Sequence, residues 1–124
     1  MPDESTMENL KDIINSIDLI QERFSSVTKP DDFVLSPDGI LLLDSISMRL
    51  QMVGELLKKT DKTNPTLFEQ YPDIEWANIM KMRDLISHHY NQIDHEIIYD
   101  ICKNSLFALK NVINAILANL DGNL

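Results

Sequence analysis

The sequence is poor in cysteine and glycine, and Cys102 is the only cysteine among its 124 residues. A single cysteine excludes an intramolecular disulfide and a multi-cysteine metal site, which suits a reducing cytosol. Cys102 lies between Ile98 and Leu106 on an apolar helical stripe. A free cysteine in such a place packs as a small hydrophobic residue, so we expect a core residue rather than a reactive thiol.

Long hydrophobic runs are also absent from the sequence. Apolar runs such as 40–43 are far shorter than the roughly 20 residues that cross a bilayer. Residues 1–5 are acidic and lack the basic start and apolar block of a secretory signal. We therefore expect a cytoplasmic protein with no membrane association.

Basic residues are few, with 11 Lys and Arg against 20 Asp and Glu, which gives a formal net charge of −9. Broad, sequence-independent binding of nucleic acid depends on Lys and Arg that neutralise phosphates, so this composition argues against it. Any contact with RNA must be local. The acidic excess is mostly a solvated face, and it also offers a docking surface for a complementary protein.

Hydrophobic periodicity predicts four helices and no strand. The apolar stripes place these helices at about 6–27, 37–59, from 75 onward, and 94–120. Ser36 before Pro37 is typical of a helix start, and Asp94 is a good N-cap. The irregular stretch at 61–72 leaves room for one extra helical turn at 66–70. The expected fold is all-α, a four-helix bundle in a single domain over 1–124.

Two residues suggest how the predicted helices pack. Gly54 costs about 1 kcal/mol inside a helix relative to alanine, which indicates that another backbone passes close to it. Trp76, near the start of the third predicted helix, is expected in the core or at a dimer interface rather than as a stacking platform for bases.

The segment 83–90 reads Arg-Asp-Leu-Ile-Ser-His-His-Tyr and contains an Arg-x4-His-x-Tyr pattern at Arg83, His88 and Tyr90. Arginine, histidine and tyrosine each occur only three times in the chain. On this composition, ~0.002 chance matches to the pattern are expected. The spacing is therefore a specific signal.

This pattern resembles the motif of HepT-like toxins, which belong to the HEPN superfamily of helical ribonucleases. Residues 52–55 look like the Gly-Glu pair of that family's second helix, and residues 73–76 resemble the Pro-x-Trp region before its motif helix. The likeness extends from about 48 to 113. Two positions depart from the family pattern, because Asp84 stands where Asn is frequent and Glu75 stands where Pro is expected.

The resemblance implies an HEPN-like helical bundle and a metal-independent endoribonuclease that needs no cofactor and leaves a 2′,3′-cyclic phosphate. Arg83 and His88 would be the catalytic residues, with Asp84 and Glu55 as candidate supporting residues. It further implies a homodimer that acts as the toxin of a type VII-like toxin–antitoxin pair. The antitoxin would be an MNT-type nucleotidyltransferase that attaches AMP to Tyr90.

The residue types suit this chemistry. Histidine exchanges a proton near neutral pH, so His88 can act as base or acid on a ribose phosphate. The permanently charged fork of Arg83 matches a phosphate whose negative charge grows in the transition state. On one straight helix, however, Arg83 and His88 point about 140° apart. Either the helix breaks before Tyr90, or the site is assembled across a two-fold axis.

Several roles stay open at this point. Glu55 either pairs with a cation of the motif region or is simply exposed. His89 and His95 are interpreted as solvated or structural, and the three histidines lack zinc-site spacing. Two other functions compete with the ribonuclease hypothesis. One is a non-catalytic helical subunit that binds substrate or nucleotide for a nucleotidyltransferase, which the low basicity favours, and the other is a plain dimerisation module.

Overall fold

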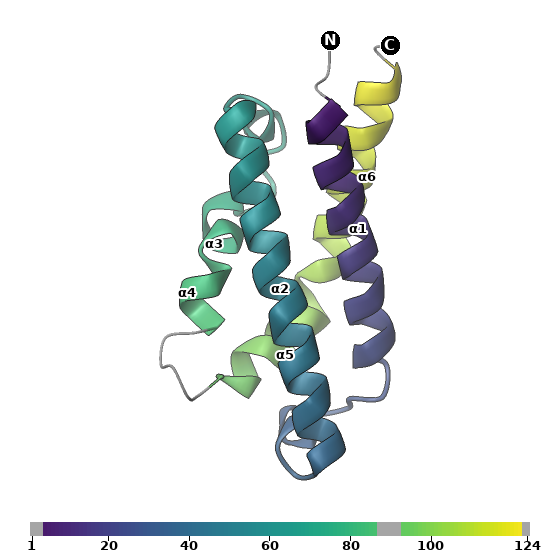
Figure 1. The fold of residues 1–124 in the computed structure, drawn as a ribbon, viewed down its shortest axis with the longest axis vertical. Coiled ribbons are helices and arrows are strands. Elements are labelled where there is room, and N and C mark those ends of the chain that lie inside the picture. Colours follow the sequence, from purple (N-terminus) through teal and green to yellow (C-terminus); the bar gives the residue numbers. More distant parts are fainter. Residues whose placement is uncertain (1–3, 87–92, 123–124) are drawn as a thin grey trace.

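The computed structural model describes residues 4–86 and 93–122, with Arg83 and Leu85 described in their backbone only (Figure 1). In this part of the chain every regular element is helical and none is a strand, which confirms the all-α prediction. The elements are α1 Glu4–Phe24, η1 Pro30–Phe33, α2 Pro37–Thr63, η2 Phe68–Gln70, α3 Trp76–Met80, α4 Met82–Ile86, α5 His95–Asn104 and α6 Leu106–Gly122. Within the same residues, no helix is both long and apolar enough to cross a membrane.

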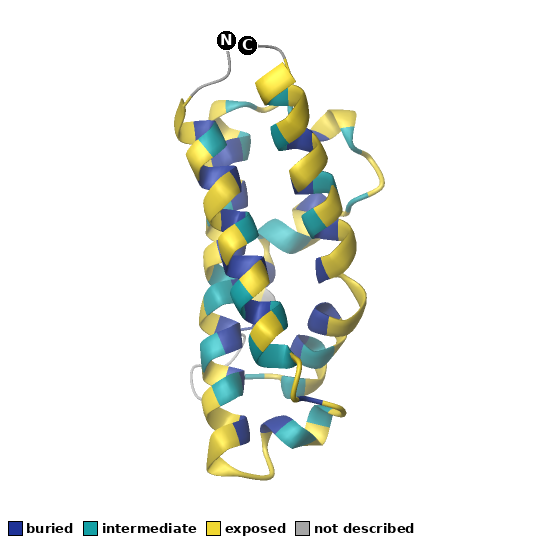
Figure 2. Ribbon diagram, turned by 90° about the vertical axis from the view of Figure 1, so that its right-hand side faces the viewer, coloured by how far each residue is buried: buried dark blue, intermediate teal, exposed yellow. Residues whose placement is uncertain are grey.

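The two longest helices, α1 and α2, form an antiparallel pair at the centre of the bundle, and α6 packs along α1 (Figures 1 and 2). Figure 2 shows how buried positions recur along the inward faces of these helices. Leu10, Ile13, Ile17 and Ile20 of α1 and Ile46, Leu50, Val53 and Leu57 of α2 are all fully buried. The core therefore follows the apolar stripes that the sequence contains.

The corner between α1 and α2 is shaped by local hydrogen bonds. Ser36 caps α2 as predicted, because its Oγ accepts a hydrogen bond from the backbone N–H of Gly39 at 3.0 Å. A Cβ at Gly39 would lie 2.0 Å from the backbone oxygen of Asp32, so only glycine fits there. The backbone and hydroxyl of Thr28 donate hydrogen bonds to the Asp32 carboxylate and lower its pKa.

The third and fourth predicted helices are not continuous, and this part of the sequence prediction is wrong. The third breaks at Lys81 into α3 and α4, and the fourth bends at Ser105 into α5 and α6. The pairs α3–α4 and α5–α6 nevertheless take the third and fourth places in the bundle, so the predicted layout holds. The C-terminal ends of the first two helices also differ from the prediction. Helix α1 ends at Phe24 instead of about residue 27, and α2 continues to Thr63 instead of about residue 59.

The bend at Ser105 keeps its backbone hydrogen bonds. The N–H of Ser105 donates to Ile101 O at 2.9 Å, and the N–H of Leu109 donates to Ser105 O at 3.2 Å. Before the bend, α5 is anchored to the end of α1 and to the loop that follows it. The Tyr99 hydroxyl donates to Thr28 O at 2.9 Å, and its ring packs 5.3 Å from that of Phe24. The bend thus lets α5 and α6 cover different parts of the core.

The irregular stretch after α2 contains the extra helical turn that the sequence left room for, here formed as η2. The Trp76 ring stacks on Phe68 at 4.3 Å, and its Nε1 donates a hydrogen bond to Tyr71 O at 2.9 Å. Asn119 of α6 donates to the Tyr71 hydroxyl at 2.7 Å. Trp76 is therefore a core residue, and the stretch before it is fastened to both α3 and α6.

Cys102 is buried in the core, as its apolar surroundings in the sequence predicted. Burial raises the pKa of the Cys102 thiol to about 12, because desolvation disfavours the thiolate. The thiolate is the nucleophilic form, so this side chain is a packing residue and not a reactive one.

Leucines at two positions of α2 offer a matched test of the core. We expect Leu50→Ala to lower the free energy of unfolding by about 2–5 kcal/mol, because the side chain is fully buried and its removal leaves a cavity. Leu41→Ala on the same helix should change it little, because Leu41 is 68% exposed. Urea unfolding measures both values, and equal effects would contradict the position of the core.

Candidate functional site

The motif that the sequence singled out begins in α4. Arg83 is the second residue of this helix, and its neighbours Met82 and Ile86 are buried. The Arg83 side chain, His88 and Tyr90 lie outside what the structure describes, and so does His89. Their convergence on one phosphate stays a prediction, and the described part of the site is the scaffold that holds both ends of the motif.

On the N-terminal side, α3 and α4 rest directly on the backbone of α2. A Cβ at Gly54 would lie 3.0 Å from the backbone oxygen of Ile79 and 3.5 Å from the Cβ of Met82. The distance to the Ile79 oxygen is shorter than an ordinary van der Waals contact, so the absence of a side chain at Gly54 lets the backbones of α2 and α3 approach each other. The close packing predicted from a glycine inside a helix is confirmed.

The break between α3 and α4 follows this contact immediately. Lys81 has helix-ending angles of φ −87° and ψ 9°, and its N–H donates back to Ala77 O at 3.2 Å. The N–H of Asp84 then donates to Lys81 O at 2.9 Å as α4 starts. The single uninterrupted helix that the sequence predicted from residue 75 onward is therefore not formed. The direction of the motif helix is set by the docking on α2 and not by helical periodicity from residue 75.

The two candidate supporting residues lie on neighbouring elements. Glu55 follows Gly54 on α2, and Asp84 follows Arg83 on α4. Both side chains are exposed. Because α4 packs on α2 around Gly54, both acidic residues lie near the contact between these two helices. Their roles in catalysis stay predictions.

On the C-terminal side, the chain after the motif is fixed by the start of α5. Asp94 caps this helix as predicted, and its Oδ1 accepts hydrogen bonds from the N–H groups of Glu96 at 3.1 Å and Ile97 at 3.2 Å. His95 is partly buried, and its Nε2 lies 3.7 Å from Oδ1 of Asp31 in η1. The structural interpretation of His95 agrees with this placement.

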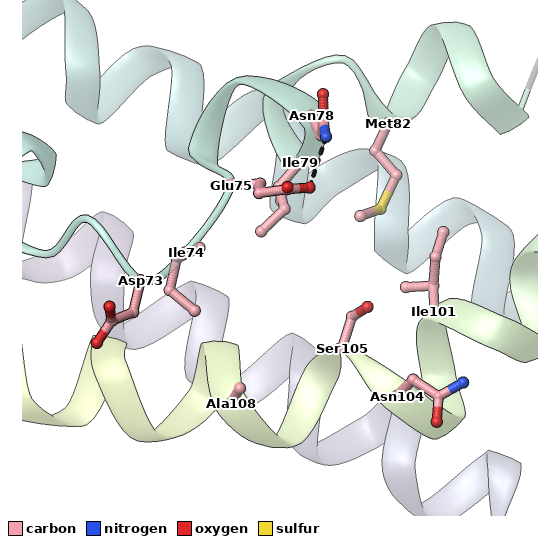
Figure 3. A pocket seen from close by; sticks show the side chains of 10 residues that line it. All are labelled: Asp73, Ile74, Glu75, Asn78, Ile79, Met82, Ile101, Asn104, Ser105 and Ala108. Carbon is pink, nitrogen blue, oxygen red and sulfur yellow. Dashed lines mark hydrogen bonds between the residues drawn. The ribbon is translucent and has the colours of Figure 1, made fainter.

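A groove beside α4 was not anticipated from the sequence (Figure 3). It lies between the α3–α4 segment and the bend of α5–α6, with a volume of about 270 Å³. Met82, the residue before Arg83, contributes to its wall. The sequence signal was weak: Lys103, Asn104 and Ser105 form a run of three polar residues within the fourth predicted helix. Within residues 4–86 and 93–122, no cluster of three or more His, Cys, Asp or Glu side chains could hold a metal ion.

The contact at Gly54 can be tested directly. Gly54→Val should lower the free energy of unfolding by about 1–3 kcal/mol, because the added side chain collides with the Ile79 carbonyl and has no room to move. Lys58→Val, at an exposed position of the same helix, controls for the lower helix propensity of valine. Amide chemical shifts of residues 76–86 should move in the first variant only. Equal stability of the two variants would contradict the close approach.

Comparison with known proteins places this scaffold in a family. The family model described as "Ribonuclease HepT-like" matches residues 13–116. Among curated proteins of Methanocaldococcus jannaschii, "Putative RNase MJ0127" is 27% identical over 94% of this chain and 84% of its own length. "Putative RNase MJ0125" of the same organism is 25% identical over 98% of each chain. The comparison with solved structures found no match.

The family match covers most of the chain, including the whole of the segment 83–90. It agrees with the all-helical fold and with the resemblance that the motif carries. The chain belongs to the HepT-like ribonuclease family.

Proposed function

We propose that this chain is a metal-independent endoribonuclease and the toxin of a type VII-like toxin–antitoxin pair in the cytoplasm. The observation that carries the proposal is the family match over residues 13–116, which spans an intact Arg-x4-His-x-Tyr motif. The named relatives, both described as RNases, support the same reaction class.

In the proposed reaction, His88 takes the proton of a ribose 2′-OH, and the 2′-oxygen attacks the adjacent phosphorus. The bond from phosphorus to the 5′-oxygen of the next nucleotide breaks, and that oxygen leaves with a proton. The products are a 2′,3′-cyclic phosphate and a free 5′-OH. Arg83 stabilises the negative charge that grows on the phosphate oxygens.

The proposed assembly is a homodimer with the motif at the two-fold axis. The spacing of the motif supports this assembly, because residues five apart on a helix point about 140° away from each other. A partner subunit would bring a second Arg83 and a second His88 to the same phosphate. The described part of α4 ends at Ile86, two residues before His88, so the 140° separation holds on the condition that the helix continues through His88.

The catalytic roles predict the behaviour of single variants. His88→Ala and Arg83→Ala should each lower RNA cleavage by at least about 100-fold, because each removes a group that acts in the transition state. Both variants should keep the helical circular dichroism and unfolding midpoint of the parent protein. Cleavage of a labelled RNA measures the loss, and EDTA should leave the parent's rate unchanged.

Arg49→Ala serves as the matched control, because it removes an arginine from α2 outside the motif. Its cleavage rate should stay close to the parent's. Full activity of His88→Ala would remove the proposed role of that residue, and loss of activity on chelation would indicate a metal mechanism. The net charge of −9 favours a competing function, a non-catalytic subunit of a nucleotidyltransferase complex. That function predicts that the parent protein itself does not cleave RNA.

Control of the proposed enzyme would act through Tyr90. An MNT-type nucleotidyltransferase antitoxin would attach AMP to the Tyr90 hydroxyl, with pyrophosphate leaving when ATP is the donor. The added phosphate would bring negative charge next to Arg83, the group that must bind the RNA phosphate. Modification would therefore stop cleavage without unfolding the protein.

Co-expression with an MNT-type nucleotidyltransferase tests the control. Intact mass measurement should show a gain of one or more AMP units, mapped to Tyr90 and absent in Tyr90→Phe. Tyr99→Phe is the control, because the Tyr99 hydroxyl is engaged with Thr28 in the fold. A neutralised toxin that carries no AMP would show that the partner inhibits by steric binding instead.

A further inference from the structure

The groove beside α4 has an apolar wall drawn from several elements (Figure 3). Met82 and Ile101 are buried within the fold, whereas Ile74 and Ile79 remain partly accessible. In Figure 3 the Met82 thioether points into the space between these elements. A volume of about 270 Å³ with this lining suits a long, flexible side chain rather than a water molecule or a small ion.

The polar groups at the groove are mainly hydrogen-bond acceptors. Figure 3 shows the Glu75 carboxylate and the Ser105 hydroxyl on opposite sides of the space, with Asp73 at one end. The amide nitrogen of Asn78 donates to Oε2 of Glu75 at 2.8 Å and holds that carboxylate in position. The amide nitrogen of Asn104 likewise donates to the Asp100 carboxylate at 2.7 Å.

The described lining of the groove carries charge of one sign. Its lining, as far as the structure describes the chain, includes two carboxylates and no Lys, Arg or His side chain. The two asparagine amides each turn a donor toward a carboxylate, so they do not neutralise the site. An occupant must therefore bring positive charge and donors, together with an apolar stem for the isoleucine and methionine wall.

We propose that this groove is a docking site for an arginine side chain of a partner protein. The methylene stem packs on Ile79 and Met82, and the planar guanidinium donates to the Glu75 carboxylate. RNA is disfavoured here, because its phosphates would meet Glu75 and Asp73 on a protein of net charge −9. The inference does not depend on ribonuclease activity.

Docking at this place would touch the motif helix. Met82 lines the groove and directly precedes Arg83, and its Cβ lies against the Gly54 contact. A bound side chain would thus pack against the residue that seats α4 on α2. The surface is accordingly one through which a partner reaches α4.

The first test uses N-acetyl-arginine amide as a probe on the full chain, followed through its methyl NMR signals. We expect saturable binding in the millimolar range, typical of a single anchoring side chain. Shifts should be largest at the δ1 methyls of Ile74, Ile79 and Ile101 and the ε methyl of Met82. N-acetyl-citrulline amide has nearly the same shape without the charge and should bind roughly tenfold more weakly.

The second test changes the groove. Glu75→Gln should weaken binding of the arginine probe by roughly fivefold or more, because it removes the charge and keeps the side-chain shape. Glu69→Gln, at an exposed position of η2 outside the groove, is the matched control and should bind as the parent does. Unchanged melting temperatures exclude loss of fold as the cause.

Several outcomes would overturn the assignment. Equal binding of the citrulline and arginine probes, or equal binding by Glu75→Gln and the parent, would show that charge recognition is absent. A short RNA that shifts the same methyls, and does so more strongly in Glu75→Gln, would make the groove an RNA subsite. A change of oligomeric state in Glu75→Gln by light scattering would mean that a second copy of this chain occupies it. Ribonuclease activity is measured separately, so its absence would not count for or against the groove.

Discussion

The region that carries the motif depends on the close approach between Gly54 and the carbonyl of Ile79. Helix α3 has five residues, and α4 has five within the part of the chain that the structure describes; a helical piece of this length is not stable in water by itself. Their order must come from packing, and the packing surface is the backbone of α2. A single position without a side chain therefore fixes where the motif helix begins.

The elements that the sequence predicted well are those specified by local signals. The stripes of α1 and α2 repeat over many turns, and the caps Ser36 and Asp94 act within three residues of their own position. The breaks at Lys81 and Ser105 were missed, because neither is a proline or glycine and nothing nearby in the sequence forbids a helix there. Both breaks arise where a helix must satisfy two packing surfaces at once, which is a property of the folded bundle.

The candidate site likewise has one part that the sequence predicts and one part that depends on the fold. The spacing of Arg83, His88 and Tyr90 identifies them and their chemistry, because residue type and interval are written in the sequence. The groove at Glu75 could not be predicted from residue type and spacing, because its lining joins residues 73–82 to residues 101–108. That juxtaposition exists only after the chain bends at Ser105. The reactive groups are therefore specified by the sequence, whereas the surfaces beside them are created by the fold.

The unequal sequence separations of the contacts have a consequence for the order of folding. The central pair α1 and α2 is joined by a short connection and closes with a small loss of chain entropy. Tyr99 bonds to Thr28 and Asn119 to Tyr71 across 71 and 48 positions, so these contacts form only when the chain has largely collapsed. The segment from Trp76 to Ile86 has no stability of its own and joins late. Because this segment is held by packing alone, it opens first in the native state. Amide protons of residues 76–86 therefore exchange with solvent while those of α1 and α2 remain protected.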